Sequence, residues 1–475
     1  MAKLFGTDGV RGVANTELTC DIAFKLGQAA VEFLGKTIVV GKDTRLSGDM
    51  LGNALSAGIM SMGGNVLDAG IIPTPGVAYL VRELHAEGGI VISASHNPPE
   101  YNGIKFFDAQ GFKLPDAVED EIEAFIVNGG LEGEVAAAEE AAWSAAQAAA
   151  PDAPADATSY LASEIKMPAG AEVGVVIPLE NACDIYIDHA ARSIEDQGIS
   201  FKGLRIALDT GHGASSLTSP EALRRLGAEV IVINDDFDGM DINVQCGSTH
   251  LEPLRALMAE TGADVGIAHD GDADRVMLMA PDGTEIDGDM VEAVCALDMR
   301  ERGVLAGDTV VSTVMCNFGF VRAMKEMGIN VVQTKVGDRY VLEAMREHGY
   351  SIGGEQSGHM ILLDHNSTGD GLMTACQFLA AVIRSGKPVG EAIQVMEKMP
   401  QTLINVRVND KHAVEDSAEV AAAVAAAEEA LGEDGRVLLR PSGTEPVVRV
   451  MVEAVDPAAA QAHAEAIAAV VEACV

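Results

Sequence analysis

The chain has 475 residues, and its 72 acidic residues against 32 Lys and Arg give a formal net charge of −40. This length exceeds what one hydrophobic core usually supports, so about three or four domains are expected. The negative charge repels the phosphates of nucleic acids and of anionic membranes, which excludes a general binder of either. A phosphate site in this chain must therefore concentrate its few cations locally.

Hydrophobic residues make up 48% of the chain and exclude global disorder, while only 4% is aromatic, so aliphatic side chains must fill the cores. The seven cysteines form no C-x-x-C pair, which favours a reducing compartment. No apolar run reaches the roughly 18 residues of a membrane helix, and the first residues show no hydrophobic signal core. We expect a cytoplasmic protein without membrane or nucleic-acid partners.

Helical and strand-like segments alternate over the first part of the chain. Helices are expected at 21–34 and 50–61, and strands at 37–40, 65–69 and 89–93. This alternation predicts βαβ units and a mostly parallel sheet, whose ligand sites lie in loops beyond the carboxyl ends of the strands. The S-A-S-H-N-P segment directly follows the last of these strands and has that position.

The segment 136–157 shows the clearest change in composition, because it is dominated by alanine and contains two prolines. Ala favours helix and Pro ends it, so we expect a surface helix followed by a flexible linker with no chemistry of its own. After this segment the α/β alternation resumes, with strands expected at 204–209, 228–234, 264–269, 308–314 and 330–334. These strands predict two further α/β units.

The order of elements changes after Lys398. A strand at 403–408 and a helix near 415–431 are followed by strands at 436–439 and 447–452 and by an amphipathic helix at 457–473. This succession predicts a small α+β domain at the end of the chain.

The sharpest chemical motif is D-G-D-A-D-R, which runs from Asp270 to Arg275. Its three carboxylates, on Asp270, Asp272 and Asp274, can converge on one hard divalent cation, and oxygen-only ligands suit Mg²⁺ better than zinc. The motif is no calcium-binding EF-hand, because Pro281 stands where that loop needs Glu. A solvated acidic turn is the alternative. A three-acid site with open coordination positions would bind a metal that also contacts a substrate phosphate.

A second motif places Ser95 at a strand end, beside His96 and Asn97 and ten residues before Lys105. This arrangement is typical of a nucleophile with a nearby cation. A plain turn built on the following proline is the alternative. A Ser–His hydrolase is disfavoured, because the chain lacks a G-x-S-x-G elbow at this serine.

A third motif, R-P-S-G-T-E-P-V-V-R-V, begins at Arg440 between two expected strands. It combines guanidinium groups, two hydroxyls and a glycine whose N–H can approach closely, which are the donors that a phosphate dianion needs. Arg440 and Arg449 are also rare cations in a strongly acidic chain. A simple hairpin turn is the alternative.

The fourth motif is G-G-E-Q-S-G-H, from Gly353 to His359. Its Glu and Ser can form hydrogen bonds with sugar hydroxyls, and its His titrates near neutral pH, where it can transfer protons. An ordinary polar loop is the alternative.

Together, and in this order, the four motifs and the opening F-G-T-D-G-V-R-G resemble the α-D-phosphohexomutase superfamily. The resemblance implies an α/β fold class, with three similar α/β domains with mixed sheets plus a smaller C-terminal α+β domain around a central cleft. With the expected elements, it gives domain bounds of 1–180 (phosphoserine loop), 181–282 (metal loop), 283–397 (sugar loop) and 398–475 (phosphate loop).

The resemblance also implies a reaction in which phosphorylated Ser95 passes its phosphoryl group to a sugar phosphate and takes another back through a bisphosphate intermediate. One Mg²⁺ per site and the sugar 1,6-bisphosphate are the implied cofactors, and a homodimer is the implied assembly. The implied site residues are Ser95, Arg11, Lys105, Arg275 and His359 for catalysis, Ser95, Asp270, Asp272 and Asp274 for the metal, and Glu355, Ser357, Arg440, Ser442, Gly443, Thr444 and Arg449 for substrate. Lys105 and His359 remain alternative candidates for the general acid/base.

Three details resemble the branch of the superfamily that converts glucosamine 6-phosphate to glucosamine 1-phosphate, which would supply UDP-N-acetylglucosamine for cell-wall synthesis. They are Gln356, C-G-S-T-H at 246–250 and V-G-D-R-Y-V at 336–341. The alternatives are a phosphomannomutase/phosphoglucomutase, where Met more often replaces this Gln, and a Mg²⁺-dependent sugar-phosphate phosphatase. A non-catalytic sensor is disfavoured, because Ser95, the aspartates and the phosphate loop are all intact.

Overall fold

The computed structural model describes residues 4–6, 9–131, 133, 168–408, 414, 417–441 and 446–474. These residues form two compact units, the first drawn from 1–314 and 332–393 and the second from 315–331 and 394–475. The expected Ala-rich helix and linker at 136–157 lie outside the described residues. Among the helices that are described, none combines the length and apolar character needed to cross a membrane.

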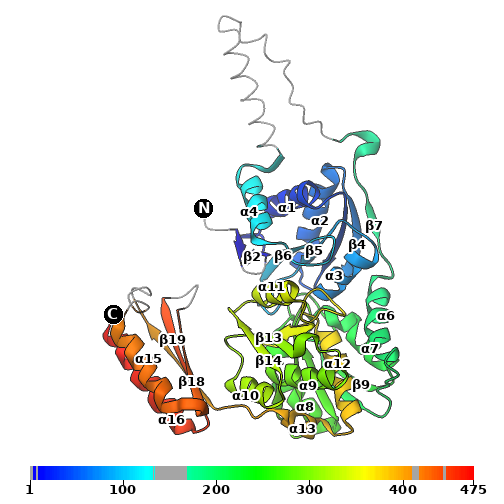
Figure 1. The fold of residues 1–475 in the computed structure, drawn as a ribbon. Helices are drawn as coiled ribbons and strands as arrows, with labels where there is room; N and C mark the ends of the chain where they lie inside the picture. The colour runs from blue at the N-terminus through cyan, green and yellow to red at the C-terminus, as the bar shows by residue number, and fades with distance from the viewer. Residues whose placement is uncertain are drawn as a thin grey trace, which may run out of the picture. The chain divides into compact units, whose positions relative to one another are not determined.

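The first unit begins with a seven-stranded mixed sheet (Figure 1). Its order is β1-β2-β6-β5-β3-β4-β7. The strands are β1 (Phe5–Gly6), β2 (Gly9–Val13), β3 (Thr37–Lys42), β4 (Asn65–Ile71), β5 (Gly88–Ile92), β6 (Tyr101–Phe107) and β7 (Val176–Pro178). β3 pairs in parallel with β4 and β5, whereas β6 runs antiparallel to β5 and β2.

Helices cover both faces of this sheet. The helices are α1 (Cys20–Phe33), α2 (Ser47–Ser61), α3 (Thr74–Glu83) and α4 (Asp116–Val127). α1, α2 and α4 share one hydrophobic core with alternate residues of β3 and β5, such as Ile38 and Ile90. Val77 and Val81 of α3 pack against Gly89 of β5, on the opposite face.

A five-stranded sheet follows in the order β12-β11-β10-β8-β9. Its strands are β8 (Arg205–Asp209), β9 (Glu229–Ile233), β10 (Val265–His269), β11 (Val276–Met279) and β12 (Glu285–Ile286). The accompanying helices are α6 (Ala182–Glu195), α7 (Ser219–Arg225) and α8 (Glu252–Thr261). β10 lies parallel to β8 and antiparallel to β11, so the segment joining β10 to β11 is a tight reversal at the carboxyl end of β10.

The third sheet has four strands in the order β14-β13-β15-β16. They are β13 (Thr309–Thr313), β14 (Asn330–Thr334), β15 (Ile352–Gly354) and β16 (Met360–Leu362). Its helices are α9 (Gly288–Glu301), α11 (Asp338–His348), α12 (Gly371–Ser385) and the short α13 (Val389–Ala392). β15 and β16 form an antiparallel pair, and the loop between them carries the G-E-Q-S-G-H motif.

The second unit contains a three-stranded antiparallel sheet in the order β17-β19-β18. Its elements are β17 (Gln401–Arg407), β18 (Gly435–Pro441), β19 (Val447–Ala454), α15 (Ala418–Leu431) and α16 (Pro457–Ala473), with α10 (Phe318–Glu326) from the 315–331 segment. Val and Ala dominate the core between this sheet and α15 and α16. This composition follows from the chain's low aromatic content.

The described residues confirm the predicted fold class of three α/β domains with mixed sheets and a small C-terminal α+β domain. The prediction of a mostly parallel first sheet is wrong for half of its pairings. The chain turns back after Ser95, and residues 101–107, where the sequence predicts no strand, return as β6, antiparallel to β5. This return brings Lys105 opposite Val91, close to the serine loop.

Candidate active site

Ser95 lies in the loop that follows β5 and is almost completely buried. Its φ of 52° is in the left-handed region, which a residue with a side chain rarely adopts. Its backbone N–H donates to Ser93 Oγ at 2.9 Å, and its own Oγ donates to Asp270 Oδ2 at 2.6 Å. The turn therefore directs the serine hydroxyl at the first carboxylate of the acidic motif.

The acidic motif occupies the reversal between β10 and β11. Carboxylate oxygens of Asp270, Asp272 and Asp274 lie within 4.8 Å of one another, and all three side chains are buried. Ala273, between the last two, has a φ of 54°, so the loop is tightly wound where the carboxylates converge. Thr74, which starts α3, donates its hydroxyl to Asp272 Oδ2 at 2.6 Å. The first and second sheets thus contribute to one cluster of oxygen atoms.

The electrostatics of this cluster fit a hard divalent cation. Burial raises the pKa of Asp270 well above its usual range, and the neighbouring carboxylates of Asp274 and Asp272 add to that shift. The Oδ1 atoms of Asp272 and Asp274 are buried and have no hydrogen-bond partner among the described residues. Crowded carboxylates with orphaned oxygens are stabilised by a cation, and an all-oxygen donor set suits Mg²⁺. The residues present therefore fit the metal implied by the sequence.

Lys105 is a buried cation in direct contact with the acidic motif. Its side chain is 2% exposed, and its Nζ lies 2.9 Å from Asp272 Oδ2 and 3.5 Å from Asp274 Oδ2. Burial acts to raise the pKa of Asp274, but Lys105 and His359 outweigh it and hold that pKa well below its usual range. A buried ammonium group thus offsets part of the negative charge beside Ser95.

Two arginines bring further positive charge to the same region. Burial, Arg275 and Arg11 together lower the pKa of His96 to about 4, so this ring next to Ser95 is neutral at pH 7. Arg11 lies on β2, where it pairs with Gly103 of β6. The structure therefore brings Arg11 and Arg275 into the electrostatic environment of the serine loop.

The G-E-Q-S-G-H loop is joined to the acidic motif by backbone pairing. Arg275 and His359 form an isolated antiparallel bridge, and the N–H of Val276 donates to the carbonyl of Gly358 at 3.1 Å. Glu355 Oε1 accepts the N–H of Gly337 at 3.0 Å. The loop is thus fixed between the second and third sheets.

His359 faces two carboxylates at this junction. Its Nδ1 lies 3.6 Å from Asp274, and its Nε2 lies 3.4 Å from Asp338. Burial lowers the pKa of His359, but the two carboxylates outweigh burial and raise it above its ordinary value. Lys105 and His359 therefore both contact Asp274, and both remain candidates for proton transfer.

The remaining candidate residues belong to the second unit. Arg440 on β18 stands directly opposite Arg449 on β19, so the two guanidinium groups project from the same face of the sheet. Like charges in this position repel one another, and a bound anion would offset that repulsion. Ser442, Gly443 and Thr444 lie outside the described residues.

Sequence reasoning missed two polar residues that contact the serine loop, Arg45 and Asn243. Both donate to the carbonyl oxygen of Ser95 at 2.9 Å. Arg45 belongs to the D-T-R triplet at the carboxyl end of β3, a position where functional residues of a parallel sheet gather, and this was the available signal. Nothing in the local sequence marks Asn243.

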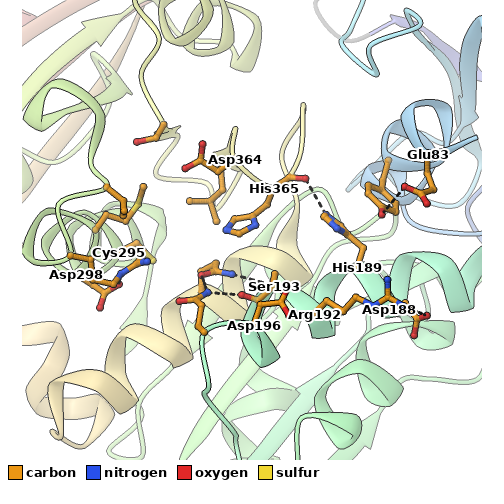
Figure 2. A pocket seen from close by; sticks show the side chains of 18 of the residues that line it. Glu83, Asp188, His189, Arg192, Ser193, Asp196, Cys295, Asp298, Asp364 and His365 are labelled. Atoms are coloured by element: carbon orange, nitrogen blue, oxygen red, sulfur yellow. Dashed lines mark hydrogen bonds and ion pairs between the residues drawn. The ribbon is translucent and has the colours of Figure 1, made fainter. Parts of the chain in front are cut away.

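A separate pocket of about 640 Å³ lies between helices of the first unit (Figure 2). His189 stacks on Tyr79 with ring centroids 3.8 Å apart, and its Nε2 lies 3.0 Å from the carbonyl oxygen of His365. Gln377 donates to Ser193 Oγ at 3.0 Å. These polar groups thus form hydrogen bonds with one another in the walls of the pocket. None of the site residues predicted from the sequence lines it.

The chain matches all four domains described for the phosphoglucomutase/phosphomannomutase family. The alpha/beta/alpha domain I matches residues 2–131, domain II matches 184–283, domain III matches 287–399, and the C-terminal domain matches 403–470. Together these segments cover most of the chain.

Curated relatives match along the full length. The chain is 48% identical over 478 residues to the phosphoglucosamine mutase of Carboxydothermus hydrogenoformans, covering 99% of this chain and 100% of that protein. It is 48% identical over 473 residues to the phosphoglucosamine mutase of Heliobacterium modesticaldum, covering 98% and 99%.

Solved structures share the fold at lower identity. A phosphoglucomutase/phosphomannomutase family protein from Burkholderia thailandensis has a TM-score of 0.79 at 24% identity, covering 99% of this chain and 97% of that one. The N-acetylphosphoglucosamine mutase of Aspergillus fumigatus, in complex with GlcNAc-6P and magnesium, has a TM-score of 0.68 at 17% identity, covering 99% and 96%.

Proposed function

This chain belongs to the phosphoglucosamine mutases of the phosphohexomutase superfamily, and we propose that it is an isomerase that interconverts glucosamine 6-phosphate and glucosamine 1-phosphate. One observation carries the proposal at the level of chemistry. The hydroxyl of Ser95 lies 2.6 Å from Asp270, beside three buried carboxylates that converge on one point. A hydroxyl held beside a divalent-cation site is suited to carry a phosphoryl group.

In the proposed reaction, Ser95 enters as a phosphoserine. The O1 hydroxyl of glucosamine 6-phosphate attacks the phosphorus and passes its proton to the general acid/base, the bond from phosphorus to Ser95 Oγ breaks, Oγ takes up a proton, and glucosamine 1,6-bisphosphate forms. The bisphosphate reorients, Ser95 Oγ gives up its proton and attacks the 6-phosphoryl group, the bond from that phosphorus to the sugar O6 breaks, and O6 takes up a proton from the general acid/base. Glucosamine 1-phosphate is released, and Ser95 is phosphorylated again.

Asp270, Asp272, Asp274 and the Ser95 oxygen are the residues proposed to hold the metal. A bound Mg²⁺ would neutralise negative charge on the phosphoryl group. Arg11, Arg275 and Lys105 supply positive charge from the chain itself. Either Lys105 or His359 moves the proton of the sugar hydroxyl, since both contact Asp274 at the edge of the carboxylate cluster.

Substrate binding is assigned to two parts of the chain. Glu355 and Ser357, on the loop after β15, are proposed to bind sugar hydroxyls. In the second unit, Arg440 and Arg449, with Ser442, Gly443 and Thr444, are proposed to bind the phosphate that is not being transferred. Support comes from the opposed guanidinium groups of β18 and β19, because a phosphate dianion can accept from both.

The proposal also includes the pathway, the assembly, the domain bounds and the cellular location of the enzyme. The product would supply UDP-N-acetylglucosamine for cell-wall synthesis, and the expected homodimer and the domain bounds at 180, 282 and 397 belong to the same proposal. A cytoplasmic location is supported by the cysteines, all seven of which are free thiols in the described structure.

The experiment that tests the substrate compares turnover of glucosamine, glucose and mannose 6-phosphates, with Mg²⁺ and the matching 1,6-bisphosphate present. We expect the highest kcat/KM for glucosamine 6-phosphate. A preference for glucose or mannose phosphate would instead assign a phosphoglucomutase/phosphomannomutase. Release of inorganic phosphate without isomerisation would assign a phosphatase.

A further inference from the structure

Arg45 is a fully buried cation that neither the metal site nor the proposed phosphate site uses. It follows β3, and its side chain is 0% exposed. Its Nε donates to Asp43 Oδ2 at 2.9 Å, and the same carboxylate oxygen accepts the hydroxyl of Ser93. Asp43 thus fixes the guanidinium plane and the strand end that leads into the serine loop.

The other two nitrogens of Arg45 are directed at the backbone of the serine loop. Nη2 donates to the carbonyl oxygens of Ser95 at 2.9 Å and Asn97 at 2.7 Å. Nη1 donates to the carbonyl oxygens of Pro98 and, at 2.9 Å, of Tyr101. One planar group therefore gathers four carbonyl oxygens of the segment 95–101, a pattern that the fork of donors on arginine permits and a lysine ammonium cannot reproduce.

Asn243, which follows β9 of the second sheet, donates hydrogen bonds to two of the same carbonyl groups. Its Nδ2 donates to the carbonyl oxygens of Ser95 at 2.9 Å and Asn97 at 3.2 Å. The carbonyl oxygen of Ser95 thus has two donors from segments about 50 and 150 residues away along the chain. These bonds hold a serine whose φ of 52° would otherwise be disfavoured.

We propose that Arg45, assisted by Asn243, is a positioning residue that holds the serine loop so that Ser95 Oγ stays beside Asp270. Its charge is directed at backbone carbonyls, so it acts through Ser95 and does not bind the substrate phosphate. The inference rests on the proposed function, because its consequence is a slower phosphoryl transfer at Ser95. Misplacement of a reacting atom by about 1 Å can slow a reaction about 100-fold.

The test uses Arg45→Lys, which keeps the buried charge but loses the fork. We expect kcat for glucosamine 6-phosphate to fall about 10- to 100-fold, while KM stays within about 2-fold of the wild-type value. Transfer of a phosphoryl group from glucosamine 1,6-bisphosphate to the dephosphorylated enzyme should slow by the same factor as kcat. Arg82→Lys is the matched control, since Arg82 also donates from one Nη to a backbone carbonyl, that of His365. The control should retain wild-type kcat.

A KM that rises while kcat is unchanged would overturn the inference, because Arg45 would then bind substrate; unchanged kcat and KM would overturn it too. If Arg45→Lys does not fold, Asn243→Ala decides: a fall in kcat of about 3- to 10-fold at constant KM supports positioning, and wild-type kinetics contradict it. Failure of the proposed function is distinguishable, because the wild-type enzyme itself would then not isomerise glucosamine 6-phosphate.

Discussion

Ser95 owes its position to its backbone as much as to its side chain. The left-handed turn at this residue directs the hydroxyl at Asp270, while buried donors hold the carbonyl oxygen of the same residue. Lys105 and His359 approach the neighbouring Asp274. The hydroxyl of Ser95, the proposed phosphoryl carrier, is thus held in part by donors to its backbone that the proposed reaction does not use, as expected for an enzyme that relies on positioning and charge stabilisation.

Replacing Ser95 with Ala removes the proposed phosphoryl carrier. We predict that Ser95→Ala abolishes mutase turnover and leaves the thermal midpoint within a few degrees of wild type, because only one hydroxyl and its hydrogen bonds with Asp270 and His96 are lost. Ser61→Ala is the matched control, since among the described residues that hydroxyl bonds only to the carbonyl of Gly58 within α2. Measurable turnover in Ser95→Ala would assign the phosphoryl carrier to another residue.

Compact motifs made most of the candidate site predictable from the sequence. Ser95 and the aspartates from 270 to 274 each stand in a short segment with recognisable chemistry, and the structure brings them together. Asn243 and Thr74 were missed, because their role arises from contacts across about 150 and 200 positions of the chain. A single sequence carries no signal for such contacts.

At the scale of elements, the first α/β layer depends on the close approach of α1 and α2. A Cβ added at Gly58 of α2 would lie 2.0 Å from the carbonyl oxygen of Phe24 on α1, and one added at Gly27 would meet the carbonyl of Leu55 at 2.1 Å. Backbone-to-backbone packing of this kind tolerates no side chain at either glycine. These helices cover the sheet that carries the serine loop.

We predict that Gly58→Ala destabilises the protein by about 1–3 kcal/mol, because the two helices must separate. Gly390→Ala, in α13, is the control: its added Cβ meets nothing within 4 Å, so higher helix propensity should leave stability unchanged or raise it by up to about 1 kcal/mol. Denaturant unfolding of both variants measures the difference. Equal midpoints would contradict the close packing of α1 on α2.

The pairing of β18 with β19 sets up the proposed phosphate contact in the second unit. Because Arg440 and Arg449 are directly opposed, removing one relieves repulsion. We predict that Arg440→Ala leaves stability unchanged or raises it by up to about 1 kcal/mol, while KM for glucosamine 6-phosphate rises. Steady-state kinetics and thermal unfolding on the same preparation test both effects. An unchanged KM would remove Arg440 from the phosphate site.

Strand and helix periodicity located most elements to within a few residues, including α16 at 457–473 and β14 at 330–334. The antiparallel β6 was not foreseen, because Y-N-G-I-K-F-F mixes polar and apolar residues without the alternation of a half-buried strand, and all of its residues except the first are buried. A strand covered on both faces leaves no period-two pattern in the sequence.

At the scale of the whole molecule, a chain of net charge −40 handles anionic sugar phosphates by gathering its cations at particular places. In the first unit these cations are Arg11, Lys105 and Arg275, which lie near the serine loop and the acidic motif. In the second unit they are Arg440 on β18 and Arg449 on β19, which stand opposite each other. The family match extends over all four domains and so over most of the chain.

In the proposed mechanism the enzyme works through a phosphoryl group on Ser95. The most direct measurement is peptide mapping of the purified protein by mass spectrometry, before and after incubation with glucosamine 1,6-bisphosphate and Mg²⁺, with formation of glucosamine 1-phosphate followed in the same sample. We predict one phosphate, located on Ser95, together with conversion of glucosamine 6-phosphate. Full conversion by a protein that carries no phosphate on Ser95 under either condition would show that Ser95 is not the phosphoryl carrier.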